Sequence, residues 1–318
     1  MTISKLPVPF ANYGLLSGQL FLYAGGRAAF ETVPPSITSA TDAVDAEAPW
    51  SSKKCILLGG LSDGLLPVPY TQLLADACHD ASWSLVQPIL SSSYTGFGHG
   101  SLQRDCDELQ ELLRYLINHR QAQDFCLVGH STGCQDAVYF LEHAAPDLCD
   151  KIRVIALQAP VSDRESAAIH EGQGDHLQLA QTLVQEGKGQ EMMPRAAFWA
   201  PITAQRFVDL NEKGGRDDFF SSDFTDEELA TKLRHVGKNR NKLKVLVAFS
   251  GADEYVPDYV DKPNLTKRLV QAMNTDCDSP NLVAEGLYLE TGNHNLSEGN
   301  DDGKLFVNKV AELMKASL

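Results

Sequence analysis

The stretch FCLVGHSTGC, residues 125–134, holds a short apolar run followed by the pattern Gly-x-Ser-x-Gly. The apolar run predicts a buried strand, and the apolar spacing of residues 137–141 predicts a helix after it. A strand, a sharp turn and a helix together form the context that a nucleophilic serine requires, which makes Ser131 the candidate. Side chains in place of Gly129 or Gly133 would collide with the neighbouring strand and helix.

The segments on either side of this turn alternate between strand and helix patterns. From residue 54 the predicted order is strand, helix, strand, helix, strand, helix, strand, which indicates a mostly parallel sheet with helices on both faces. Residues 15–24 and 28–33 predict an antiparallel hairpin at one edge, and residues 34–50 predict a loop. The predicted segments of this core are 54–58, 70–79, 83–89, 102–119, 152–157, 244–250, 264–273, 286–290 and 304–315.

The alternation stops at Pro160 and resumes near residue 243. The intervening segment is polar and has helix patterns at 175–186, 201–210 and 225–235. An insertion at the carboxyl ends of the strands lies over the crevice where ligands bind. We therefore predict a core domain of residues 1–160 and 243–318 and a helical lid of residues 161–242. The aromatic residues of the lid either line a pocket or pack the lid on the sheet: Phe198, Trp199, Phe207, Phe219, Phe220 and Phe224.

A bare Gly-x-Ser-x-Gly arises by chance in roughly one chain in ten of this length, so the serine needs partners. On such a turn the serine is followed along the chain by an acid and then by a histidine. Asp253 comes just after one predicted strand, and His294 comes just after the next. Among the nine histidines only His294 lies beyond Asp253. Glu254 is the alternative acid, but a shorter acid followed by Val-Pro favours Asp253.

Two backbone N–H groups are candidates for holding the oxyanion that forms when the serine attacks a carbonyl. The glycine-rich turn at residues 59–64 follows the strand before the first helix, and we place one donor at Leu61. The other is the N–H of Thr132, at the start of the helix after the serine. The alternative for the pair Gly59-Gly60 is a tight turn with no further role.

The composition of the chain restricts its partners. A net charge of −15 argues against nucleic acid or an anionic membrane surface as a partner, and 43% apolar residues suffice for a large core.

Seven cysteines without a Cys-x-x-Cys pair indicate buried free thiols in a reducing compartment. We see no secretory signal, membrane span or metal-ligand spacing, and expect no cofactor. The expected localisation is cytoplasmic.

Four motifs carry a resemblance over nearly the whole chain: GGLSDG at 59–64, GHSTGCQD at 129–136, SGADEYVP at 250–257 and GNHNL at 292–296. With them the chain resembles the α/β-hydrolase superfamily, and within it a largely fungal branch that includes an intracellular siderophore esterase cleaving fusarinine C. The resemblance implies hydrolysis of ester bonds in a cyclic hydroxamate siderophore, with iron as part of the substrate. Fusarinine C carries free amines, which acidic lid residues would attract; the candidates are Asp163, Glu165, Glu171, Asp175, Asp217, Asp218 and Asp223.

Two other readings of the same residues stay open. One is an esterase, thioesterase or acyltransferase that acts on another small acyl compound. The other is a binding module that keeps the fold without catalysis, which would be marked by a missing serine, acid or histidine. None of the three is missing from this sequence. The oligomeric state is not indicated by the sequence.

Overall fold

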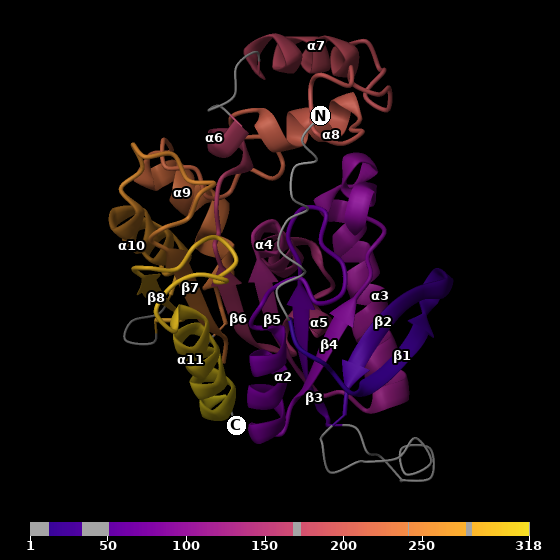
Figure 1. Ribbon diagram of the computed structural model, residues 1–318, viewed down its shortest axis with the longest axis vertical. Helices are drawn as coiled ribbons and strands as arrows, with labels where there is room; N and C mark the ends of the chain where they lie inside the picture. Colours follow the sequence, from indigo (N-terminus) through magenta and orange to yellow (C-terminus); the bar gives the residue numbers. More distant parts are fainter. Residues whose placement is uncertain (1–12, 34–50, 168–172, 241, 278–281, 318) are drawn as a thin grey trace, which may run out of the picture.

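The protein is described by a computed structural model that covers residues 13–33, 51–167, 173–240, 242–277 and 282–317 (Figure 1). The loop predicted at residues 34–50 lies outside these ranges. The strands are β1 (Gly18–Tyr23), β2 (Arg27–Thr32), β3 (Lys53–Leu58), β4 (Ser84–Pro88), β5 (Asp124–His130), β6 (Ile152–Gln158), β7 (Lys244–Ser250) and β8 (Ala284–Leu289).

These strands form one eight-stranded sheet in the order β1-β2-β4-β3-β5-β6-β7-β8. The strands from β4 to β8 run parallel to one another, whereas β1 pairs antiparallel with β2 and β2 pairs antiparallel with β4. Both the alternating core and the early hairpin are therefore confirmed. Because parallel strands share one direction, the carboxyl ends of β3, β5, β6, β7 and β8 meet at the same edge of the sheet, where ligands bind in such folds.

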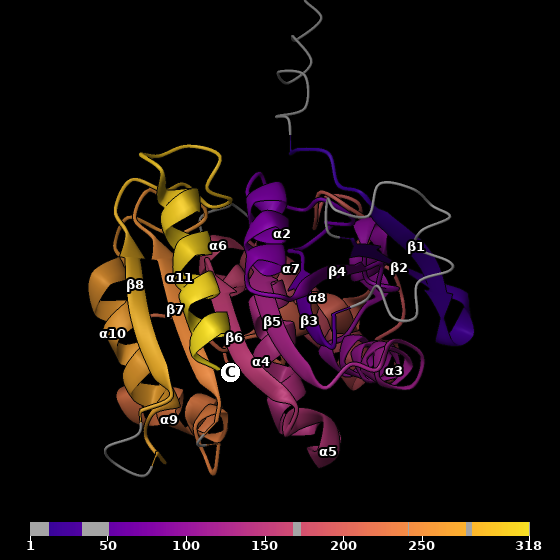
Figure 2. The same cartoon turned by 90° about the horizontal axis from the view of Figure 1, so that it is seen from below.

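Helices cover both faces of the sheet (Figures 1 and 2). Helices α2 (Thr71–Asp80) and α11 (Asp302–Ala316) pack on one face through an apolar cluster that includes Leu74 and Phe306. Helices α3 (Leu102–Arg120), α4 (Gly133–His143) and α10 (Lys262–Met273) pack on the other face, with Leu113, Phe140 and Leu269 in a second cluster. Burial on both faces explains why the central strands are almost continuously apolar. A short helix, α5 (Pro146–Cys149), was not predicted.

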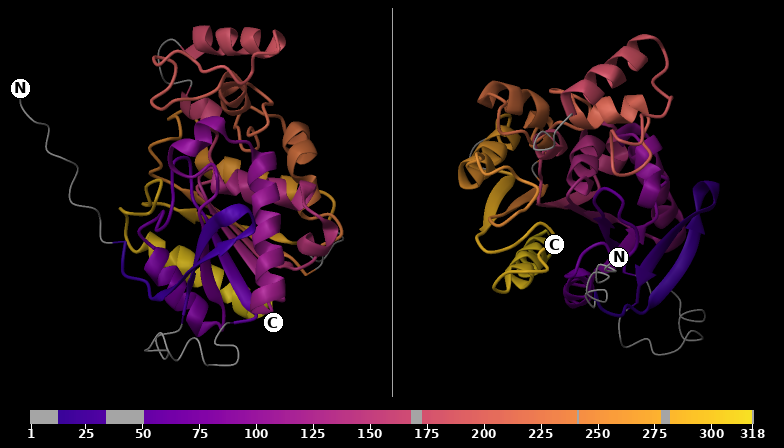
Figure 3. Two further views of the ribbon diagram at one scale, coloured as in Figure 1. Left: turned by 90° about the vertical axis from the view of Figure 1, so that its right-hand side faces the viewer. Right: turned by 45° about the horizontal axis from the view of Figure 1, so that its top comes forward.

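The inserted segment divides into two parts. Helices α6 (Asp163–Ala167), α7 (Gln173–Gln185) and α8 (Ala204–Asn211) lie beyond the carboxyl edge of the sheet, and an apolar cluster formed by α7, α8 and the segment between them is separate from the sheet core (Figures 1 and 3). By contrast, α9 (Asp226–Leu233) packs against α10, and Phe219, Phe220 and Phe224 belong to the sheet core. Phe207 packs within the separate cluster. Only the first half of the insertion therefore stands apart from the sheet.

The cysteines agree with the sequence patterns. All seven cysteines are unpaired, and all but the partly exposed Cys277 are buried, which confirms the prediction of buried free thiols. In the part of the chain that the structure describes, no helix is both long enough and apolar enough to cross a bilayer.

Candidate active site

Ser131 lies on a strained turn between β5 and α4. Its backbone has a φ of 53°, a left-handed conformation that costs a residue with a side chain roughly 1–3 kcal/mol. Glycine on both sides makes the turn possible: a Cβ on Gly129 would lie 2.4 Å from the Gly133 oxygen, and one on Gly133 would lie 2.4 Å from the Leu58 oxygen. Both predicted collisions are thus confirmed, and the turn presses the start of α4 against the end of β3.

The candidate acid and histidine are brought into direct contact. The His294 Nδ1 atom lies 3.0 Å and 2.9 Å from the two carboxylate oxygens of Asp253, whose side chain is buried. Asp253 also accepts a hydrogen bond from the backbone N–H of Tyr255 at 3.0 Å. A carboxylate only accepts, so the His294 proton sits on Nδ1 and Nε2 carries the free lone pair that a base needs.

Glu254, the alternative acid, has a different contact. Its side chain is exposed, and its Oε2 atom accepts the backbone N–H of His294 at 2.9 Å, away from the ring. The structure therefore puts Asp253 rather than Glu254 against the imidazole. Glu254 braces the loop that carries the histidine.

Ser131 and His294 line the same cavity, and both are buried, with exposed fractions of 8%. Among the hydrogen bonds of the described residues, none joins the Ser131 hydroxyl to the His294 ring. Bonds of this kind are often long in free enzymes and shorten when substrate binds. The geometry thus places the serine, the histidine and the acid together. The hydrogen bond between the Ser131 hydroxyl and the His294 ring would form when substrate binds.

The two predicted oxyanion donors lie on either side of the serine turn. Leu61 belongs to the turn after β3, and Thr132 directly follows Ser131. A Cβ on Gly60 would lie 2.8 Å from the Cβ of Ser131, so this backbone approaches the candidate serine closely. The Gly60 N–H is already used by the Asp63 carboxylate at 2.7 Å. In the described chain no protein acceptor takes the N–H of Leu61 or Thr132. Leu61 lines the cavity with Ser131, whereas Thr132 lines a small polar cavity beside it.

Sequence patterns had not assigned a role to His130, which precedes the serine. Its ring centroid lies 4.9 Å from that of His294, and its Nδ1 atom lies 2.7 Å from the side-chain oxygen of Gln158. Burial, and secondarily the positive charge of protonated His294, lower the pKa of His130 to about 3. His130 is therefore neutral at physiological pH and does not compete with His294 for a proton. The one feature of the sequence that could have pointed to His130 was its place inside the Gly-x-Ser-x-Gly motif.

The cavity has a volume of about 780 Å³, within the range of small-molecule sites. Phe198 and Trp199 line it, so only these two of the six lid aromatics face the site. Its described lining contains the carboxylates Asp63, Asp163 and Glu254 but no lysine or arginine. Burial is the main cause that raises the pKa of Asp63, opposed by its bond to the Gly60 N–H. The described residues contain no group of three or more side chains able to hold a metal ion.

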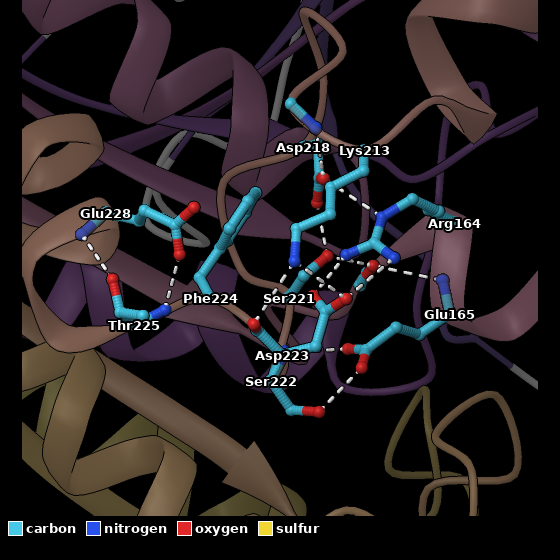
Figure 4. A network of polar contacts seen from close by, with 12 residues as sticks. Arg164, Glu165, Lys213, Asp218, Ser221, Ser222, Asp223, Phe224, Thr225 and Glu228 are labelled. Atoms are coloured by element: carbon cyan, nitrogen blue, oxygen red, sulfur yellow. Dashed lines mark hydrogen bonds and ion pairs between the residues drawn. The ribbon is translucent and has the colours of Figure 1, made fainter.

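A network of charges fixes α6, which carries Asp163 to the cavity (Figure 4). The Arg164 guanidinium contacts Asp218 at 3.0 Å and pairs with Asp223. The Glu165 carboxylate accepts from the N–H and the hydroxyl of Ser222 at 2.7 Å and 2.6 Å. These three partners, Asp218, Ser222 and Asp223, all come from the segment before α9, whose phenylalanines pack in the sheet core.

The contacts of the acidic lid residues show which of them could meet a cation in the cavity. Asp217 pairs with the buried Arg206 at 2.6 Å, and Asp218, Asp223 and Glu165 have the partners just given. Asp175 is exposed on α7, and Glu171 lies outside the described residues. Of the seven acids proposed to attract a cation, Asp163 is therefore the one in the described chain that lines the cavity.

The eight-stranded sheet, the strained serine turn and the histidine loop after the last strand define a protein of the α/β-hydrolase fold. The chain matches the family described as "Protein of unknown function (DUF1749)" over residues 7–315, and it belongs to that family.

Similar proteins support the assignment to this family and fold. The chain is 33% identical over 282 residues to "UPF0613 protein PB24D3.06c" of Schizosaccharomyces pombe, covering 83% of this chain and 86% of that protein. It is 30% identical over 316 residues to "Fusarinine C esterase sidJ" of Aspergillus fumigatus, covering 82% and 88%. Among solved structures it is similar to "Siderophore hydrolase EstB from Aspergillus fumigatus", with a TM-score of 0.75, 27% identity and coverage of 96% and 98%. The predicted resemblance is thereby confirmed.

Replacing each candidate acid separately should distinguish them. Asp253→Asn should lower kcat on an aryl ester by about 1,000- to 10,000-fold, because an amide favours the wrong histidine tautomer. Glu254→Gln keeps an acceptor for the His294 N–H and should lower kcat by less than about tenfold. Steady-state kinetics at pH 8 measures both. A larger loss in Glu254→Gln than in Asp253→Asn would refute the assignment.

Proposed function

We propose that the protein is a serine esterase that works through an acyl-enzyme. His294 takes the Ser131 proton as the serine oxygen attacks the ester carbonyl, and the N–H groups of Leu61 and Thr132 hold the oxyanion. His294 then protonates the leaving alcohol, and water repeats both steps to release the acid. Asp253 keeps the imidazole in the required tautomer. The observation that carries the proposal is the buried Asp253–His294 pair, whose histidine lines the same cavity as a serine at positive φ.

The preferred substrate in this proposal is an ester bond of a hydroxamate siderophore of the fusarinine C type. The names of the two Aspergillus fumigatus relatives support it, as does a cavity large enough for a small organic ligand. A lining with three carboxylates and no lysine or arginine suits a substrate that carries amines. Iron would arrive as part of the substrate and be released in the cytoplasm after cleavage.

The division of the chain belongs to the same proposal. The core comprises residues 1–160 and 243–318, and the insertion comprises residues 161–242. Within the insertion we assign the covering of the site to residues 161–167 and 173–211, because α6 and the segment before α8 supply Asp163, Phe198 and Trp199 to the cavity. Residues 219–236 pack with the core and support α6 through the network of Figure 4.

Product analysis tests the substrate directly. Purified protein should cleave ferric fusarinine C into its linear hydroxy acids, and Ser131→Ala should abolish this because no other group replaces the nucleophile. Chromatography of reactions with ferric fusarinine C, its acetylated form and simple aryl esters measures the preference. Rapid turnover of aryl esters with no cleavage of either siderophore would overturn the substrate. Unchanged cleavage by Ser131→Ala would overturn the mechanism.

The charge of Asp163 should control the affinity for cationic esters. Burial, and next the neighbouring Asp217, raise the pKa of Asp163 to about 7, so its carboxyl becomes charged as the pH rises through 7. KM for the free-amine siderophore should therefore fall between pH 6 and pH 8, while KM for the acetylated form stays constant. Asp163→Asn should raise KM for the amine substrate about tenfold at pH 8 and have little effect at pH 6.

Asp175→Asn is the matched control, because Asp175 is an exposed lid acid that does not line the cavity. It removes the same charge and should leave KM for both substrates unchanged. Equal responses of the amine and acetylated substrates to pH and to Asp163→Asn would exclude recognition of the amine by this carboxylate.

A further inference from the structure

Gln158 ends β6 and has no exposed surface. Strand β6 lies between β5, which leads to Ser131, and β7, which leads to Asp253. The side-chain amide nitrogen of Gln158 lies 2.9 Å from the backbone oxygen of His294 and 3.3 Å from the hydroxyl of Ser250, the last residue of β7. The backbone oxygen of Gln158 accepts the Ser131 N–H at 3.0 Å. One residue thus contacts the segments that carry the serine, the acid and the histidine.

The partners of Gln158 determine how its amide is oriented. A backbone carbonyl can only accept, so the group that faces the His294 oxygen must be the NH₂ of the amide. The amide oxygen then faces the Nδ1 atom of His130 at 2.7 Å and the hydroxyl of Tyr70 at 3.2 Å. Both must donate to it, and His130 is therefore protonated on Nδ1. The network therefore needs a side chain that both donates and accepts at this position, which a neutral amide does at any pH.

We propose that Gln158 is a positioning residue that holds the serine turn and the histidine loop in register, so that His294 meets Ser131 when substrate binds. This inference rests on the proposed esterase function. The histidine loop has few other attachments close to the ring: the Asp253 carboxylate holds Nδ1, and the exposed Glu254 holds the backbone N–H. The bond from Gln158 to the His294 carbonyl is the buried contact that ties this loop to the strand next to the nucleophile.

The magnitude of the effect follows from the geometry of proton transfer. Displacement of a reacting group by about 1 Å costs on the order of 100-fold in rate. Removing the amide leaves the His294 carbonyl and the His130 N–H buried without a partner, and such groups move toward water or another partner. Gln158 does not line the cavity, so substrate contacts stay in place. We therefore expect kcat to fall about 100-fold, with KM within about threefold of the wild-type value.

Two variants and one control test the inference. Gln158→Leu removes all side-chain hydrogen bonds. Gln158→Glu keeps the shape and the acceptor for His130 and Tyr70 but, when ionised, cannot donate to the His294 carbonyl. Gln87→Leu is the control, since Gln87 is a buried glutamine on β4 whose side chain accepts the Leu66 N–H at 2.7 Å. Among the described residues, no hydrogen bond joins the Gln87 side chain to Ser131, Asp253 or His294. The melting temperature of this control should fall, but its kcat should stay within about twofold of wild type.

The pH profile separates positioning from a loss of stability. In Gln158→Glu the added negative charge favours the imidazolium form of His294, so the acid limb of kcat/KM should move to higher pH. In Gln158→Leu the limb should stay in place while the plateau falls. Each rate is normalised to the folded fraction measured by circular dichroism.

The outcomes distinguish this inference from the proposed function. If Ser131→Ala is inactive while both Gln158 variants keep wild-type kcat and an unshifted acid limb, the positioning role is wrong and the esterase stands. If Gln158→Leu does not fold, the isosteric Gln158→Glu decides alone by its kcat and pH profile. Activity that survives Ser131→Ala would remove the esterase and the positioning role together.

Discussion

The site depends on the close backbone contact between the end of β3, the turn after β5 and the start of α4. Glycine at 129 and 133 lets these segments approach within distances that any side chain would block. The sheet core on both sides holds the turn in place and offsets the strain of roughly 1–3 kcal/mol at Ser131. This contact keeps the backbone of Ser131 at its positive φ of 53°, in a turn that borders the cavity. The remaining parts of the site are arranged around this fixed point.

The surroundings of each ionisable group near His294 then determine its charge. Several ionisable groups lie near His294, and their environments differ. Asp253 is buried and bonded to the ring, where its carboxylate would stabilise a positive charge on the imidazole. His130 stays neutral because it is buried, and the Asp63 carboxylate is bonded to a backbone N–H. Asp163, at the cavity wall, has its pKa raised to about 7, so its carboxyl changes charge near neutral pH. The Asp253–His294 pair is therefore distinct from the carboxyl at the cavity wall whose charge changes near pH 7.

The sequence was sufficient to predict the strands and helices of the sheet domain, because strands buried on both faces are continuously apolar and their helices have one apolar stripe. The order of serine, acid and histidine also singled out His294, since loops after parallel strands meet at one edge. The packing of Phe219 and Phe224 on the sheet core was not predictable, because an aromatic residue has the same signature in a lid and in a core. The hydrogen-bond partners of polar side chains could not be predicted either. Arg164 lies more than fifty residues from its partner Asp218 in the sequence. Gln158 is a single polar residue at the end of an apolar strand, and nothing in the sequence indicates its partners.

Locating a covalent adduct is the most direct measurement of whether Ser131 is an activated nucleophile. The protein is treated with a fluorophosphonate, which reacts with activated serines, and is then digested and mapped by mass spectrometry. Because Asp253 and His294 are already paired beside the serine turn, a single adduct should appear on the peptide that contains Ser131. Folded protein that leaves Ser131 unmodified, or that carries the adduct on another residue, would contradict the central claim.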